Sequence, residues 1–244
     1  MKTKTQTLEV WGEFACFTRP ELKVERFSYP VITPSAARGI FDAIYCKPKE
    51  FRWQITGIEI LSEPNYIALR RNEVKEKVSV NLVNKFRKGT KELEPIWADG
   101  DRDVTGSDTK GRTQRQTMAL KDVKYRLHAH IHPWLGFEDR LPALEAQFRR
   151  RASHGKCIYQ PYFGCREFPA YFELLDSDLS SSNVKSINIK DLGWMLYDVF
   201  DLSRPGTSSD KQAISLFKPV VRDGVLTVPP YDSEDVFKVR EGSA

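Results

Sequence analysis

The stretch 117-TMALKDVKYRLHAHIH-132 alternates apolar and polar side chains from Val123 onward. Its apolar positions are Val123, Tyr125, Leu127, Ala129 and Ile131. Its polar positions are Lys124, Arg126, His128, His130 and His132. Because successive side chains of a strand point to opposite faces of a sheet, this pattern predicts a strand with one face in a core. The strand is predicted to be central in its sheet, and its other face is predicted to be basic.

Segments on both sides of this stretch are also predicted to be strands. Residues 6–17 and 51–61 are rich in aromatic and β-branched side chains, and the second segment alternates apolar with polar residues. Gly57 is a candidate β-bulge within it. Residues 66–70 are expected to pair beside 51–61 across a short turn. Residues 168–175 are predicted to form a further strand.

Two helices are predicted between these strands. In residues 33–45, Thr33 can cap the helix and Pro34 fits its first turn. The apolar stripe of this helix is Ala37, Ile40, Phe41 and Ile44. Residues 141–155 have a similar stripe, and Gly155 is a plausible end point. The order of elements is therefore βαββαβ, which is typical of a ferredoxin-like or RNA-recognition-type fold.

The whole chain is accordingly predicted to be an α+β protein of two domains. Residues 1–178 are expected to form the ferredoxin-like domain, with a charged segment inserted at about 73–115. Residues 179–244 have short apolar runs broken by Gly and Pro, which predict a small antiparallel β-rich domain.

Composition restricts the class of protein. The chain has 244 residues with 40% hydrophobic and 29% charged side chains, which is typical of a folded protein. The net charge is only +5, but basic residues gather in clusters such as Arg149-Arg150-Arg151, which suits a polyanionic partner. The four cysteines form no C-x-x-C pair, and no apolar run approaches ~20 residues. We therefore expect a cytoplasmic protein with free thiols.

The alternating histidines do not predict a metal site. His128 and His132 would stand roughly 13 Å apart on one face of a strand, so one ion cannot bind all three rings. No other motif completes an H-x-H pair. We expect no metal and no other cofactor. An acid–base site and a solvated strand face both remain as interpretations.

Two long stretches, 34-PSAARGIFDAIYCKP-48 and 159-YQPYFGCREFPAYF-172, resemble the CRISPR-associated proteins of the fifth Cas family, in the subtype I-C variant. The likeness covers most of the chain. It implies a ferredoxin-like amino-terminal domain and a smaller β-rich carboxy-terminal domain. It also implies an endoribonuclease that cuts the repeat hairpins of the CRISPR precursor transcript without metal and then stays with the guide RNA in the interference complex.

The resemblance also implies a catalytic tyrosine, which is Tyr45 in this chain. In such a reaction the ribose 2′-hydroxyl attacks the adjoining phosphate, with a general base, a general acid and cations assisting. A Lys-His pair of some relatives falls here near Ala143-Leu144, and neither side chain can transfer a proton. The predicted substitutes are His128 and His130, because a pKa of ~6.5 leaves both protonation states available near neutrality. The reserve candidates are His154 and Lys156.

Ten basic residues are predicted to bind RNA. They are Arg38, Lys47, Lys124, Arg126, Arg149, Arg150, Arg151, His154, Lys156 and Arg166. For the arginines that end the second helix, exposed charge that offsets the helix dipole is an equal alternative. Gly164 is expected to let the backbone approach RNA or another strand closely.

The expected partners are the precursor RNA, the mature guide RNA, and the backbone and large subunits of the type I-C complex. Duplex DNA is a further candidate partner. A second hypothesis assigns the chain to another class, that of a non-catalytic RNA-binding subunit that assembles the complex. The missing Lys-His pair favours this second hypothesis, whereas the subtype I-C resemblance favours the nuclease.

Overall fold

The computed structural model describes residues 3–22, 24–92, 95–96, 98, 106, 109–175, 187, 189, 192–207 and 210–238. The chain divides into two compact units. The larger unit combines Met1–Ile67 with Met118–Ala244, and the smaller unit is Ala68–Thr117. The fold is α+β, with antiparallel sheets.

A long antiparallel sheet organises the fold, and its strand order is β6-β1-β5-β3-β10-β9. Its strands are β1 (Gln6–Ala15), β3 (Phe51–Ile60), β5 (Arg112–Pro133), β6 (Tyr171–Leu175), β9 (Val221–Arg222) and β10 (Val225–Thr227). Two more strands, β2 (Arg26–Phe27) and β4 (Tyr66–Val74), pair with β5. Strand β5 lies between β1 and β3, so the predicted central strand is confirmed.

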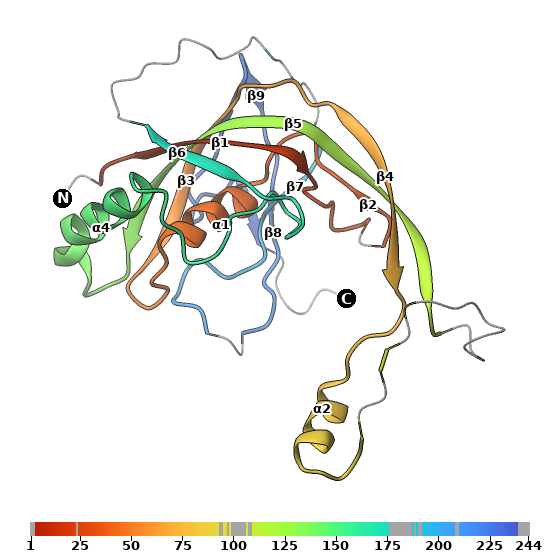
Figure 1. The fold of residues 1–244 in the computed structure, drawn as a ribbon. Coiled ribbons are helices and arrows are strands. Elements are labelled where there is room, and N and C mark those ends of the chain that lie inside the picture. Colours follow the sequence, from red (N-terminus) through yellow and green to blue (C-terminus); the bar gives the residue numbers. More distant parts are fainter. Residues whose placement is uncertain are drawn as a thin grey trace. The chain divides into compact units, whose positions relative to one another are not determined.

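Two helices, α1 (Pro34–Ile44) and α4 (Leu141–Ala152), lie on one side of this sheet (Figure 1). The short 3-10 helix η1 (Glu138–Arg140) precedes α4. The Trp53 ring joins the helices to the sheet, with its centroid 4.9 Å from that of Phe41 in α1 and 4.6 Å from that of Phe148 in α4. All three side chains are buried, and burial of each large apolar side chain contributes about 1.5–3 kcal/mol to stability.

Local sequence explains the limits of α1. The Thr33 hydroxyl accepts a hydrogen bond from the Ala36 amide at 3.2 Å, and Pro34 occupies the first turn, where an amide donor is not needed. The backbone becomes extended at Tyr45, which ends the helix. The predicted stripe Ala37, Ile40, Phe41 and Ile44 is buried. This predicted helix is therefore confirmed.

The strand predictions are confirmed except for one pairing. Residues 66–70 were expected beside 51–61, but β4 pairs with β5, so that prediction is wrong. The reason is that β3 pairs with β5 on one side and with β10 on the other. The predicted bulge is confirmed, because the register between β3 and β5 shifts between Ile55 and Gly57.

The carboxy-terminal strands belong to two sheets. Strands β9 and β10 extend the long sheet beyond β3, whereas β7 (Met195–Asp198), β8 (Ser215–Phe217) and β11 (Val236–Lys238) form a separate three-stranded sheet. The expected domain boundary at residues 178 and 179 lies outside the described residues.

The smaller unit contains the exposed helix α2 (Val80–Arg87) and most of the segment predicted to be inserted at about 73–115. Within the described part of the chain, no helix is long and apolar enough to cross a membrane.

Candidate functional site

Tyr45 is held firmly at the end of α1. Its amide donates to the Phe41 carbonyl at 2.9 Å, and its own carbonyl accepts the Trp53 indole N–H at 2.9 Å. Its ring packs against Phe51, with the centroids 5.5 Å apart, and the residue is only 7% exposed. Backbone and ring are thus both fixed, so Tyr45 has a defined orientation.

The carboxyl end of α4 lies beside the carboxyl end of α1. The Arg151 Nε donates to the Ile44 carbonyl at 2.6 Å, and the Ile158 amide donates to the Ala43 carbonyl at 2.6 Å. Both acceptors belong to the last turn of α1, where backbone carbonyls have no partner within the helix. The chain that follows α4 is therefore tied to the region next to Tyr45.

His154 and Lys156 belong to this same turn. The Lys156 amide donates to the Arg151 carbonyl at 2.9 Å, and His154 Nδ1 lies 2.8 Å from the Arg150 carbonyl oxygen. Gly155 between them has a φ of 63°, in the turn that follows α4, and the helix itself ends at Ala152, three residues before the predicted stop. The side chains of His154 and Lys156 are exposed. The structure therefore brings the two reserve candidates to the end of the helix that carries Tyr45.

The predicted catalytic histidines lie on the other face of the sheet. Trp53 pairs with Ile131, and both are buried on the face that the helices cover. Gln54 pairs with His130, and the alternation of strands turns both side chains to the opposite face. His128, two residues earlier, shares the face of His130.

Tyr45 is consequently separated from this pair. Its ring contacts Phe51, whose side chain is on the same face as Trp53, two residues further along β3. His128 and His130 are on the far side of the sheet from that contact. The structure does not bring Tyr45, His128 and His130 together.

Both ring nitrogens of His128 have partners. Nδ1 lies 3.1 Å from the Thr7 hydroxyl on β1, and Nε2 lies 2.7 Å from a Glu59 carboxylate oxygen on β3. These contacts fix the ring within the sheet face.

Two carboxylates balance the positive charge of this face. Arg126 donates to Glu59 at 2.8 Å and to Glu9 at 3.3 Å, and Lys124 lies 2.6 Å from Glu9. Burial raises the pKa of Glu9, but hydrogen bonds and charges from Lys124 and Arg126 outweigh it and lower that pKa overall. The face predicted to be basic is thus charge-balanced at its centre. Sequence periodicity missed this because the balancing residues lie on other strands.

The remaining two histidines of the face have depressed pKa values. Burial is the main cause of the lowered pKa of His130, and the charge of His132 adds to it. Burial also lowers the pKa of His132, helped by Arg52, its partner across the β3–β5 pair.

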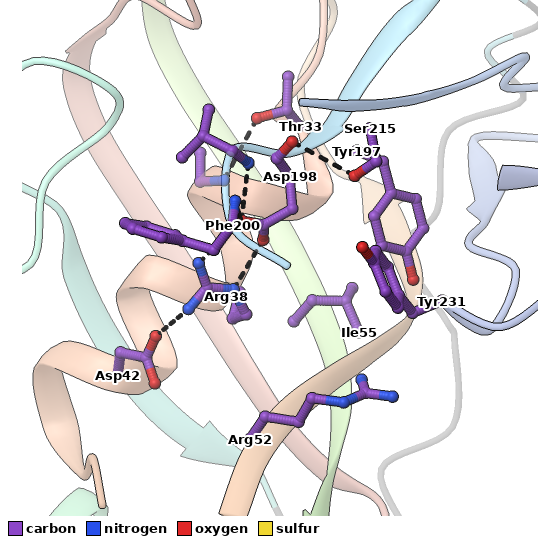
Figure 2. A network of polar contacts seen from close by, with 12 residues as sticks. Thr33, Arg38, Asp42, Arg52, Ile55, Tyr197, Asp198, Phe200, Ser215 and Tyr231 are labelled. Atoms are coloured by element: carbon purple, nitrogen blue, oxygen red, sulfur yellow. Dashed lines mark hydrogen bonds and ion pairs between the residues drawn. The ribbon is translucent and has the colours of Figure 1, made fainter. Parts of the chain in front are cut away.

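Arg38 is a buried ion-pair partner in this structure. Its Nε and Nη2 donate to the Asp198 carboxylate at 2.7 and 3.1 Å, and Nη1 donates to Asp42 (Figure 2). The Phe200 ring also lies against its guanidinium, 5.6 Å from centroid to Cζ. The sequence gives no sign of these contacts, because Asp198 is 160 positions away.

Arg126 is also buried, whereas the other residues predicted to bind RNA are half-buried or exposed. Lys47 lies 3.1 Å from Glu50, and Arg150 donates to Gln147 at 2.8 Å. Arg149 donates to the Gln6 side chain at 3.4 Å. Arg166 is exposed in the turn that follows Gly164.

Gly164 lets the chain approach β1 closely. Its φ is 79°, and a Cβ atom there would lie 2.0 Å from the Cys16 carbonyl oxygen. The Cys16 amide donates to the neighbouring Phe163 carbonyl at 3.0 Å. The predicted close approach therefore occurs, and its partner is the backbone of Cys16, the residue that directly follows β1.

A cleft of about 710 Å³ was not predicted from the sequence. It lies beside the start of β3 and is lined from α1, from β3, by Trp134, and by residues of the segment 200–213. In the described part of the chain, no three His, Cys, Asp or Glu side chains gather as a metal site.

The fold and this site define the class of the protein: it is an α+β protein with a fixed tyrosine, Tyr45, at the place where α1 and α4 end, and with Arg151 bound at the same helix end. A solved structure titled "Crystal Structure of CRISPR-associated Protein" has the same fold, with a TM-score of 0.62 and 21% identity over 96% of this chain and 97% of that one. The family model described as "CRISPR-associated protein (Cas_Cas5)" matches residues 6–229. The chain belongs to this family, in its subtype I-C branch.

Two curated relatives match nearly the full chain. A protein of Mannheimia succiniciproducens named "CRISPR pre-crRNA endoribonuclease Cas5d" is 39% identical over 94% of this chain and 96% of its own length. A protein of Thermus thermophilus with the same name is 37% identical over 97% of this chain and 96% of its own length. The predicted family resemblance is confirmed.

Proposed function

We propose that this protein is an endoribonuclease that cuts the repeat hairpins of the CRISPR precursor RNA and keeps the guide RNA bound. The observation that carries the proposal is the sequence identity of 39% and 37% to two relatives named as pre-crRNA endoribonucleases, over nearly the whole chain. The position of Tyr45, with basic side chains around it, supports the same activity.

The proposed reaction needs no metal. The 2′-hydroxyl attacks the adjoining phosphorus, the bond to the 5′ oxygen breaks, and the products are a 2′,3′-cyclic phosphate and a 5′-hydroxyl. Tyr45 orients or activates the attacking hydroxyl, and cationic side chains offset the charge that develops on the phosphate. Among them, Arg151 is tied to the same helix end as Tyr45.

His154 and Lys156 are the better candidates for proton transfer in this reaction. They lie in the turn next to Tyr45, whereas His128 and His130 lie on the opposite face of the sheet. A general acid or base must reach the reacting oxygen directly or through one water molecule. We therefore place His128 and His130 second, as side chains that act only if RNA also crosses that face.

The test is cleavage of labelled cognate repeat RNA by the purified protein in excess EDTA. We expect products with a cyclic phosphate end, and a loss of about 10²- to 10⁴-fold in rate for Tyr45→Phe, which keeps the ring packing. His154→Ala is expected to slow cleavage far more than His130→Ala. Cleavage abolished by EDTA and restored by a divalent cation would contradict the metal-free mechanism.

A non-catalytic assembly subunit is the second candidate. It is favoured by Ala143, which is exposed, and Leu144, which is buried, at the place where some relatives are expected to have a Lys-His pair. Neither side chain transfers protons. Tight RNA binding without cleavage, by a wild-type protein that melts cooperatively, would establish this role instead.

We further infer that residues 1–178 form a ferredoxin-like domain and residues 179–244 a smaller one. The order β6-β1-β5-β3, with helices after β1 and after β5, supports the first part. The proposed partners are the precursor and guide RNA and the backbone and large subunits of a type I-C complex, with duplex DNA as a further one. The proposed location is the cytoplasm.

A further inference from the structure

The cleft beside β3 is large enough to hold a ligand. Its volume of about 710 Å³ is within the usual range for small-molecule sites. Strand β10 pairs with β3 only at Gly57–Glu59, and the cleft lies at the earlier part of β3, next to Phe51 and Arg52. Cys46, which directly follows Tyr45, also lines it. A ligand here would lie close to the predicted catalytic residue.

Arg52 is a buried cation in the wall of this cleft. Its side chain is 7% exposed. One nitrogen donates to Gln54 at 2.6 Å, another lies 3.9 Å from the exposed carboxylate of Asp232, and Nε has no partner among the described residues. Burial lowers the pKa of Arg52. A buried guanidinium with so few acceptors is unfavourable, so an anionic ligand at this place would be strongly stabilised.

The other two guanidinium groups of the cleft are already neutralised. Arg38 binds Asp42 and Asp198. Arg204 lies 3.4 Å from Asp201 and 3.2 Å from Asp210. Arg52 is therefore the buried cation that an anion in the cleft can bind, and the exposed Lys211 is a further cation of the lining. Arg52 is visible apart from the Arg38 contacts in Figure 2.

Aromatic side chains supply the rest of the wall. The Trp134 ring is held in place by a hydrogen bond from its N–H to the Pro48 carbonyl at 2.8 Å. Phe200 lines the cleft and is 51% exposed, which leaves its ring open to a partner. Aromatic faces beside a cation are the combination that binds unpaired nucleotides, with the base on the ring and the phosphate on the charge.

We propose that the cleft holds one unpaired nucleotide of the bound RNA, with its phosphate on Arg52 and its base against Trp134 or Phe200. This inference rests on the proposed function, because it takes RNA as the ligand. It adds a subsite next to Tyr45 that selects a base beside the cut. RNA sequence is read mainly from unstacked bases, so this subsite would contribute specificity for the repeat.

The base contact is tested by a cycle of protein and RNA changes. Repeat RNAs that each lack one unpaired base are titrated with the wild-type protein and with Phe200→Ala by fluorescence anisotropy. We expect loss of one particular base to weaken wild-type binding by about 5- to 100-fold, the range that stacking of one base implies. Trp134→Leu is titrated in the same way. In whichever of the two variants lacks the stacking ring, the shortened RNA should bind no worse than the intact RNA does.

A matched control is Phe237→Ala, because Phe237 is 55% exposed and does not line the cleft. It should keep the wild-type sensitivity to the missing base. Equal sensitivity in wild type, Phe200→Ala and Trp134→Leu would overturn the proposal while leaving the proposed nuclease activity intact.

The phosphate contact is tested by salt dependence. Arg52→Gln should reduce the slope of log K against log [salt] by about 0.7, the value for one phosphate of a single strand, whereas Phe200→Ala should not change it. Arg52→Lys should restore the slope. An unchanged slope in an Arg52→Gln protein that melts like the wild type would remove Arg52 from the subsite.

A last arm distinguishes RNA from a free nucleotide. Adenosine and uridine monophosphate and inorganic phosphate are titrated while tryptophan fluorescence is followed in wild type and in Trp134→Phe. Quenching by a mononucleotide that depends on Trp134, together with no base dependence in the RNA series, would assign the cleft to a free nucleotide and overturn the proposal. Absence of RNA binding by the wild type would overturn both this subsite and the proposed function, whereas RNA binding without cleavage leaves the subsite test intact.

Discussion

The histidines of β5 differ in their surroundings although they share one face of the sheet. His128 is bound on both sides by side chains of β1 and β3, whereas His130 and His132 are mainly affected by burial. Alternation in the sequence makes the three positions equivalent. The difference arises from strands that are distant in the sequence, so the sequence alone did not predict it.

We expect the protein to lose stability as the pH falls through the range in which His130 and His132 take up protons. Their pKa values are lower in the folded than in the unfolded chain, so the unfolded chain binds more protons. The stability is fully present above the unfolded histidine pKa of about 6.5 and is lost progressively below it. Urea unfolding between about pH 7.5 and 5.5 measures this effect.

The double variant His130→Gln, His132→Gln should show a weaker pH dependence than the wild type. His154→Gln changes a histidine outside this face and serves as the control, with an unchanged dependence. A constant difference in the free energy of unfolding between wild type and double variant at every pH would contradict the assignment.

Gly164→Ala should destabilise the protein strongly. The backbone has a φ of 79°, and the new Cβ would lie 2.0 Å from the Cys16 carbonyl oxygen, a backbone atom that cannot rotate away. Left-handed backbone alone costs about 1–2 kcal/mol for a non-glycine residue, and the clash adds to it. We expect a loss of about 3 kcal/mol or more by urea denaturation.

Gly39→Ala is the matched control for this change. Gly39 lies within α1, and a Cβ atom there would meet no atom within 4 Å. Alanine is favoured over glycine in helix interiors by roughly 0.5–1 kcal/mol, so a stability equal to or above that of wild type is expected. Equal losses for the two variants would show that the close approach to β1 is not the cause.

At the level of secondary-structure elements, three neighbouring strands balance one another's charges. Glu9 on β1, Arg126 on β5 and Glu59 on β3 lie side by side across the sheet. The residues pair in register, so their side chains share a face. This row makes the centre of the sheet face a structural network, in addition to any contact with RNA.

Arg126→Met should therefore be costly. It leaves two largely buried carboxylates, Glu9 and Glu59, without their shared partner, and breaking a buried ion network costs about 3–5 kcal/mol. Lys124→Met removes a more exposed cation from the same face, with an expected cost of about 1 kcal/mol or less. Chemical denaturation of both variants tests this, and similar small losses would argue against the network.

The sequence predicted the secondary-structure elements better than it predicted which strands pair with each other. The cap at Thr33 and the alternation of residues 123–131 are local signals, and both led to correct elements. The partner of β4 depends instead on which edges of β3 are already occupied, and β10 occupies one of them from more than 160 residues away. Pairing of that kind is set by tertiary structure and leaves no trace in local periodicity.

At the level of the whole molecule, Arg38 and Asp198 connect distant parts of the larger unit. The pair joins α1 to β7, and Asp198 also accepts hydrogen bonds from the Val199 and Phe200 amides at 2.8 and 3.0 Å. Phe200, which lines the cleft, is thereby fixed relative to α1. The candidate subsite exists only because residues from separate regions meet, which explains why sequence motifs did not predict it.

The Arg38–Asp198 ion pair yields a prediction for the stability of the folded chain. Asp198→Asn keeps the shape of the side chain but removes one charge from a contact whose carboxylate side chain is 2% exposed. It should lower the free energy of unfolding by about 3 kcal/mol, because the Arg38 guanidinium would remain buried with one carboxylate fewer. Hydrogen exchange should accelerate in β7 and β8, while the helix-covered part of β5 keeps its protection.

Asp235→Asn, an exposed change in the same carboxy-terminal region, should cost less than about 0.5 kcal/mol. If the cleft binds RNA as proposed, Asp198→Asn should also weaken RNA binding, since the contact with Arg38 that fixes Phe200 relative to α1 would be weaker. A variant as stable as Asp235→Asn would mean that the three-stranded sheet is held to α1 by its apolar contacts alone.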